Sequence, residues 1–289
     1  MATAARVIAA AVVAAVVGWP GPVMAAQPPA APSPVDRAFQ RLYNFDFPGS
    51  LTILDAAATT DPTNPLLASV RAATYLFMEL NRMRILDTQF FMNDDNMVDG
   101  SSRSVPDPAV RARLFAAIDQ ARKLAQARLA TNPNDVDGLF ALCMSAGTET
   151  DYTALVERRT WRSTKLAPVA LVPARKLLAQ TPPFYDAYLQ FGALEYIVGN
   201  LPFFVRWFIH YDGIAGDKRR GIDELKLVVR HGRYYGPFAR ILLAVVSLRE
   251  QKFADAEELM RGLSDDFPEN ALFRREAAKA AERARRAKR

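Results

Sequence analysis

The stretch FDFPGSLTILDAAATTDPTN, residues 45–64, has a counterpart near the other end of the chain in QKFADAEELMRGLSDDFPEN, residues 251–270. Each places a small residue, an aliphatic residue three positions later and a proline twelve positions after the small residue, and a third segment near the middle of the chain does the same. The three sets are Ser50, Ile53 and Pro62; Ala121, Leu124 and Pro133; and Ala256, Leu259 and Pro268. A pattern that recurs in this way predicts an internal repeat.

The repeated residues have a direct physical meaning in a pair of helices. The small residue allows two antiparallel helices to approach closely, and we expect the aliphatic residue to pack one turn along the same face. The proline ends the first helix, because it is tolerated only in the first turn of a helix. Each proline lies in a short polar turn that contains an asparagine: DPTN at 61–64, NPND at 132–135 and FPEN at 267–270. Ala174, Leu177 and Pro182 form a shorter variant.

This pattern resembles the tetratricopeptide repeat (TPR), and the first and last copies resemble it best. The resemblance implies an all-α fold, namely an α-solenoid of antiparallel helix pairs with irregular repeats. The family is known for scaffolding between proteins, so the resemblance also implies a protein-binding role. From the apolar spacing and the turns, we expect helices at 35–44, 48–60, 65–91, 107–131, 135–147, 149–163, 167–180, 184–199, 202–211, 217–231, 236–250, 253–265 and 270–287. No run of strict apolar and polar alternation indicates a strand.

Changes in composition along the chain divide it into four segments. Residues 1–26 have one basic residue, an apolar run and small residues before Ala25, which is the layout of a secretory signal peptide. Residues 27–34, QPPAAPSP, form a proline-rich linker. We expect a TPR-like helical repeat domain over 35–273 and a basic C-terminal helix or tail over 274–289.

The leader indicates that the mature protein is periplasmic or secreted. The alternative is an uncleaved N-terminal membrane anchor. The unbroken apolar run covers only residues 7–17, whereas a bilayer span needs roughly 20 residues. Cleavage near Ala25 or Ala26 is therefore the preferred interpretation.

The net charge of +6 is concentrated at the C-terminus. Residues 274–289 hold eight Lys or Arg and two Glu, and the leader holds Arg6, so residues 27–273 carry a net charge of −1. A nearly neutral body argues against nucleic acid as the partner. The basic end is interpreted as a solvated helix whose arginines favour the helix dipole. Contact with an anionic lipid, cell wall or nucleic acid remains the alternative for this tail.

The sequence offers no recognisable catalytic or metal site, and no cofactor is expected. Cys143 is the only cysteine and lies in an apolar run, so it is predicted to be a small buried hydrophobe. His210 and His231 are the only histidines and are too far apart for a common metal-binding motif. The acidic loop at 92–107 lacks the calcium-binding EF-hand spacing. It is interpreted as a surface loop, with a weak cation site as the alternative.

Two segments stand out as candidate binding sites. Phe203, Phe204, Trp207 and Phe208 crowd the predicted helix 202–211. This helix is interpreted as buried between neighbours, with a groove for an apolar ligand or partner helix as one alternative and a peripheral membrane contact as another. The second segment contains Arg158, Arg159, Trp161 and Arg162. It is either a solvated helix with one buried tryptophan or a row that binds an acidic partner.

The segment 216–221 is rich in glycine and basic residues but lacks the spacing of a phosphate-binding loop. We expect Asp217 to be a helix N-cap and Gly221 to be a small residue at a helix contact.

From these observations we expect an exported, non-enzymatic scaffold that binds a protein or peptide. The alternative is a periplasmic binding or accessory protein for a small apolar molecule or lipid, which the aromatic helix 202–211 would hold.

Overall fold

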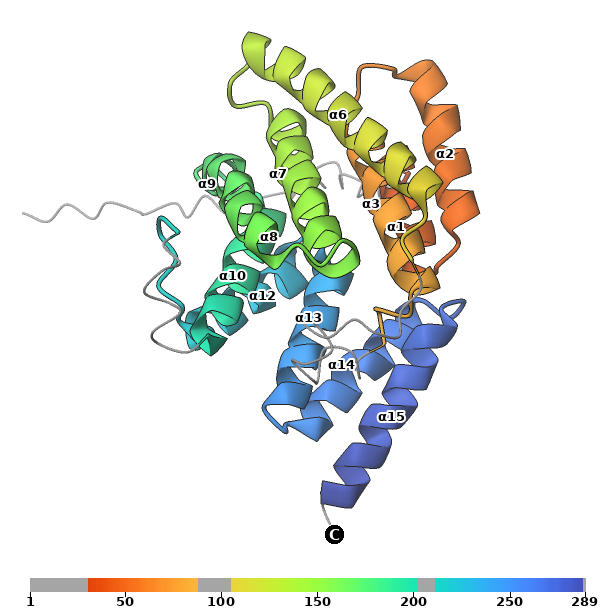
Figure 1. The fold of residues 1–289 in the computed structure, drawn as a ribbon, viewed down its shortest axis with the longest axis vertical. Coiled ribbons are helices and arrows are strands. Elements are labelled where there is room, and N and C mark those ends of the chain that lie inside the picture. Colours follow the sequence, from red (N-terminus) through yellow and green to blue (C-terminus); the bar gives the residue numbers. More distant parts are fainter. Residues whose placement is uncertain (1–30, 88–104, 202–210, 288–289) are drawn as a thin grey trace, which may run out of the picture. The chain divides into compact units, whose positions relative to one another are not determined.

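The computed structural model describes residues 31–87, 105–201 and 211–287, apart from the side chains of Thr160 and Trp161. The chain divides into two units, Met1–Ala31 and Pro32–Arg289, and the description below concerns the second. Its described residues are all-α and contain no strand (Figure 1). The helices are α1 (Pro34–Tyr43), α2 (Phe47–Thr60), α3 (Pro65–Arg82), α6 (Pro108–Thr131), α7 (Val136–Asp151), α8 (Thr160–Leu166), α9 (Leu171–Leu178), α10 (Tyr188–Asn200), α12 (Lys218–His231), α13 (Gly236–Arg249), α14 (Phe253–Asp266) and α15 (Ala271–Ala287), with short helices η1 (Tyr152–Val156), η2 (Ala167–Ala170) and η3 (Tyr185–Ala187).

Helices that follow one another along the chain pack together in pairs. The pairs α2–α3, α6–α7, α9–α10, α12–α13 and α14–α15 are each in contact. Neighbouring pairs also touch, since α3 contacts α6 and α7, α7 contacts α9, α10 contacts α12, and α13 contacts α14. This arrangement confirms the expected all-α class and the expected packing between helices.

The small residues of the repeated pattern lie at the helix contacts. Ser50, Ala121, Ala174 and Ala256 are all completely buried, as expected. Of the aliphatic residues three positions later, Leu177 is completely buried, whereas Ile53, Leu124 and Leu259 are only half-buried. Ile53 and Leu259 nevertheless pack against the hydrophobic core, as expected. In those three segments the buried residue lies four positions after the small one, at Leu54, Ala125 and Met260. A spacing of four follows the face of an α-helix more closely than a spacing of three where two helices cross.

The proline turns act as caps for the helices that follow them. Asn64 accepts a hydrogen bond from the backbone N–H of Leu66, and Asn270 accepts one from Leu272 in the equivalent position (both 3.0 Å). In the middle copy, Asp135 accepts from Gly138 (2.7 Å). A capping side chain satisfies a backbone donor that the first turn of a helix leaves unpaired.

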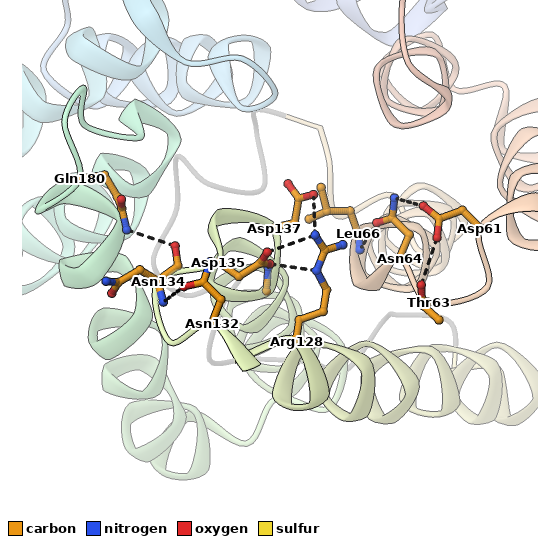
Figure 2. A network of polar contacts seen from close by, with 11 residues as sticks. Asp61, Thr63, Asn64, Leu66, Arg128, Asn132, Asn134, Asp135, Asp137 and Gln180 are labelled. Carbon is orange, nitrogen blue, oxygen red and sulfur yellow. Dashed lines mark hydrogen bonds and ion pairs between the residues drawn. The ribbon is translucent and has the colours of Figure 1, made fainter. Parts of the chain in front are cut away.

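Two of these turns lie close to each other in space. Figure 2 shows the turn that contains Asp61 and Asn64 beside the one that contains Asp135. Arg128, in the last turn of α6, pairs with Asp135 (3.0 Å) and with Asp137 (3.7 Å). Desolvation raises the pKa of Asp137, and the nearby Arg128 opposes this. The polar side chains of this network therefore connect the C-terminal end of α6 with the N-terminal end of α7.

Two predicted helix boundaries are wrong. The predicted helix 65–91 ends at Arg82, where Arg84 adopts a left-handed conformation (φ 55°). The predicted break between 147 and 149 does not exist, because α7 continues to Asp151 and then widens into the π-helix η1. The separation between helices comes instead at residues 157–159.

The α10–α12 contact shows why glycine is needed at a close approach of two helices. A Cβ atom at Gly221 would lie 2.7 Å from the carbonyl oxygen of Gly192, which real Cβ atoms do not approach. Asp217 caps α12 by accepting from the N–H groups of Arg219 and Arg220 (2.9 and 3.2 Å). Both expectations for this segment are confirmed.

The first helix contacts segments near the end of the chain. The hydroxyl of Tyr43 donates to the carbonyl oxygen of Tyr234 (3.0 Å), and the amide of Asn270 donates to the carbonyl oxygen of Tyr43 (2.8 Å). Arg233 forms an ion pair with Asp36 (2.8 Å). These contacts tie α1 to the turn before α13 and to the turn before α15.

The basic C-terminal segment is helical up to Ala287. It forms α15, whose buried residues Phe273, Glu276, Ala280 and Ala284 recur every third or fourth position. This spacing places one stripe of the helix against α14, with which it is in contact.

Candidate partner-binding face

The segment that follows η1 carries only positive charge. Residues 158–185 contain Arg158, Arg159, Arg162, Lys165, Arg175 and Lys176 and no Asp or Glu. The segment folds as α8, η2 and α9 in succession. One face of α9 packs against the core: Leu171, Ala174 and Leu177 are buried, and α9 contacts α7.

The opposite side forms an exposed stripe along these helices. Between 162 and 178 the exposed residues are Arg162, Lys165, Val169, Val172 and Lys176. They are three or four positions apart throughout, which is the spacing of one face of an α-helix. The 3₁₀ helix η2, which holds Val169, joins the two α-helices of this run. Val169 and Val172 are 51% and 60% exposed, and among the described residues only two other large hydrophobic side chains, Val105 and Ile197, are exposed to a similar or greater extent. We call these five residues the α8–α9 stripe.

Three cations of the stripe have no partner among the residues that the structure describes. The side chains of Arg162, Lys165 and Lys176 form neither an ion pair nor a hydrogen bond with any residue that the structure describes. The nearest carboxylate along the chain, Glu157, pairs with Arg111 at 2.8 Å and lies 3.8 Å from Arg159. Within the described part of the chain, an anionic group that approaches these three side chains therefore displaces no existing partner.

The residues predicted for this site lie at its N-terminal end. Arg158 and Arg159 form the link between η1 and α8, where Arg158 adopts a left-handed conformation (φ 56°). Arg162 lies on the exposed side of α8. Trp161 belongs to α8, but its side chain is outside the described part. Phe203, Phe204, Trp207 and Phe208 are outside the described residues altogether.

The sequence interpretation missed the C-terminal half of the stripe. Lys165 stands out only as part of a basic run, and nothing in the sequence alone marks Val169, Val172 or Lys176 as exposed. The spacing of three and four positions from Arg162 to Lys176 is the signal that identifies them, provided that the opposite positions are known to be buried.

The end of the aromatic segment is attached to the same helices. The hydroxyl of Tyr211 donates to the carbonyl oxygen of Thr164 in α8 (2.9 Å). Arg175 in α9 pairs with Asp212 (3.1 Å) and lies over the ring of Phe191 at 5.9 Å. Tyr211 is the last residue of the predicted helix 202–211 and the one residue of that range that the structure describes.

Most buried carboxylates of the described chain serve the fold. Asp186 is 1% exposed and accepts hydrogen bonds from the backbone N–H groups of Arg233, Tyr234 and Tyr235 (2.8, 2.8 and 2.6 Å). Desolvation raises its pKa, and these three bonds oppose the rise. Glu79 and Glu195 likewise accept from backbone N–H groups that precede α6 and α12, and each also binds an arginine.

Asp151 is different from these carboxylates. It ends α7, directly before the π-helix η1, and none of the described residues donates a hydrogen bond to it. Part of its surface remains accessible, yet desolvation raises its pKa to about 7. Such a group titrates near neutral pH.

The histidines and the cysteine offer no reactive arrangement where they are described. His231 is the last residue of α12, as expected, and its ring packs against Tyr185 at 4.7 Å. Cys143 is completely buried, and burial, followed by the charge of Asp186, raises the pKa of its thiol to about 12. Among the described residues, no group of three or more His, Cys, Asp or Glu side chains is placed to hold a metal ion. His210 and most of the acidic loop 92–107 lie outside that part.

Comparisons with known proteins give no relative from which a role could be transferred. No protein-family model matches the chain, and neither the curated proteins nor the solved structures contain a match. None of the helices in the described part is both long and apolar enough to cross a membrane.

Proposed function

We propose that this chain is an exported scaffold that binds another protein, built as a TPR-like solenoid of helix pairs and without catalytic activity of its own. The observation that carries the proposal is the α8–α9 stripe. It combines three cations that lack partners within the described residues with two exposed valines. Exposed apolar side chains that are bordered by charge are typical of a surface that a partner covers.

The repeated pattern supports the proposal at the level of architecture. Small buried residues and capped turns recur in α2–α3, α6–α7 and α14–α15. A chain of helix pairs presents helix faces that do not pack internally, and such faces bind other proteins in repeat families. The leader at 1–26 supports export, and the resulting site of action is the periplasm or the medium.

A site-specific cross-link tests this function. A photoreactive amino acid at position 169 in the full chain, expressed in its source cells, is expected to capture one protein in stoichiometric amount. The same amino acid at position 261, which is exposed on α14, controls for random collision. Capture at both positions alike, or a co-purifying apolar small molecule without any protein, would contradict the scaffold and favour the ligand-binding alternative.

A further inference from the structure

The geometry points to an acidic amphipathic helix, supplied by a partner protein, as the occupant of the α8–α9 stripe. This inference rests on the proposed function and specifies the partner's chemistry. The exposed positions 162, 165, 169, 172 and 176 are separated by three, four, three and four residues. In α-helices this is the spacing with which one helix packs along another in a coiled coil, and here it spans α8, the 3₁₀ helix η2 and α9.

The order of the side chains within the stripe defines what the partner helix must present. Val169 and Val172 occupy the centre, Arg162 and Lys165 precede them, and Lys176 follows them. A matching helix has apolar residues in its middle, at intervals of three and four, and Asp or Glu toward both ends. No acidic residue occurs from 158 to 185, and the cations of the stripe itself attract such a helix and disfavour a basic one. The exposed Asp212, which pairs with Arg175 in α9, is an acidic group beside this segment.

The width of the apolar area argues for a helix and against a lipid surface. A helix that lies in a membrane interface needs a broad apolar face with several large side chains. The α8–α9 stripe has two valines, and both are flanked along the stripe by cations rather than by further apolar residues. A narrow apolar seam with charged ends matches one helix better than a bilayer.

The size of the stripe sets the expected affinity. Its fifteen positions from 162 to 176 extend for about 20 Å, which is the length of a helix of roughly two heptads. The area buried by such a short contact falls below that of a standard stable interface, so we expect a dissociation constant in the micromolar range.

Binding of a synthetic helix to the purified full chain tests the inference. The probe is a labelled peptide of about 21 residues with leucine at the central heptad positions and glutamate toward both ends. We expect micromolar binding by fluorescence anisotropy, and at least roughly ten-fold weaker binding of a scrambled peptide of identical composition. The double variant Val169→Gln and Val172→Gln is expected to weaken binding by a similar factor. Ile197→Gln, an equally exposed aliphatic residue on α10, is the matched control.

A reversal of charge makes the test independent of apolar contacts. In the variant Arg162→Glu and Lys165→Glu, affinity for the acidic peptide should fall, and a lysine version of the same peptide should bind instead. All substituted residues are exposed, so circular dichroism and thermal unfolding should match the unmodified protein.

Three results would overturn the inference. They are failure of the acidic peptide to bind, equal binding of the scrambled peptide, and binding of anionic phospholipid vesicles that the same substitutions abolish. The cross-link at position 169 separates this failure from failure of the proposed function. A captured protein that contacts the stripe through a different structure leaves the scaffold intact and removes only the acidic helix.

Discussion

The side chain of Asp151 makes the stability of this protein depend on pH. Its pKa is raised to about 7 in the folded state by desolvation, whereas an aspartate in an unfolded chain titrates near 3.9. The protonated form is therefore favoured by folding. Its contribution is fully present below about pH 4 and is lost as the pH rises through about 7, at roughly 1.4 kcal/mol for each unit of pKa difference.

We predict that Asp151→Asn is more stable than the unmodified protein at pH 8, by up to a few kcal/mol, because the variant removes a carboxylate that is costly to ionise. The difference should shrink toward pH 5. Urea unfolding at the two pH values measures it. Asp265→Asn, on the exposed surface of α14, controls for the loss of one negative charge. An advantage of Asp151→Asn that is equal at both pH values would show that the carboxylate is well solvated.

At the scale of the helix pair, the asparagines of two equivalent turns make the same cap but donate their side-chain amides to different acceptors. Asn64 and Asn270 cap α3 and α15 in the same way. Asn64 directs its amide to the exposed Asp61 (3.1 Å), whereas Asn270 is completely buried and binds the carbonyl oxygen of Tyr43. We predict that Asn64→Ala lowers the free energy of unfolding by about 1 kcal/mol, the usual value for a lost cap.

For Asn270→Ala we expect a larger loss, of about 2–4 kcal/mol, because a buried carbonyl oxygen also loses its donor. Denaturant unfolding of the two variants under the same conditions gives the comparison. Equal losses at both positions would mean that the bond to Tyr43 contributes nothing beyond the cap.

The helix pairs could be predicted from the sequence, but several of their ends could not. The small residues and proline turns identify α2, α6 and α14 because close packing and capping need particular residue types. In contrast, α3 ends with Arg84 in a conformation that glycine usually provides. The N–H of Ile85 donates to the carbonyl oxygen of Leu80 (2.9 Å), and Ile85 itself is completely buried. Tertiary burial of Ile85 thus ends this helix, and no local signal marks it.

Only part of the α8–α9 stripe could be predicted from the sequence, for a related reason. Arg158, Arg159 and Arg162 are visible as a basic run, because charge is a property of the sequence alone. The exposure of Val169 and Val172 cannot be predicted from the sequence, since valine is usually buried. Only the packing of Leu171, Ala174 and Leu177 against the core shows that these two valines face outward.

At the scale of the whole second unit, the contacts of α1 with the far end of the chain could not be predicted either. Tyr43 and Asn270 are 227 positions apart, and no repeat motif encodes a bond between the first helix and the last turn. In an open row of repeats each pair contacts only its neighbours, so that stability is local. Here the rings of Tyr43 and Phe267 also pack at 5.3 Å. The first helix is therefore part of the environment of the last pairs.

The contacts of α1 with the C-terminal helix pairs predict that these parts of the fold unfold cooperatively. Tyr43→Phe removes the hydroxyl that donates to the carbonyl oxygen of Tyr234 and leaves that buried oxygen without this donor, at a cost of about 1–3 kcal/mol. If α1 stabilises the C-terminal pairs, the slowest amides of α13, α14 and α15 should exchange faster in the variant, together with those of α1. Hydrogen exchange followed by mass spectrometry measures both regions in one experiment. Faster exchange confined to α1, α2 and α3 would instead show that the helix pairs unfold one after another, as in an open array. The contacts between α1 and the C-terminal turns would then contribute little to stability.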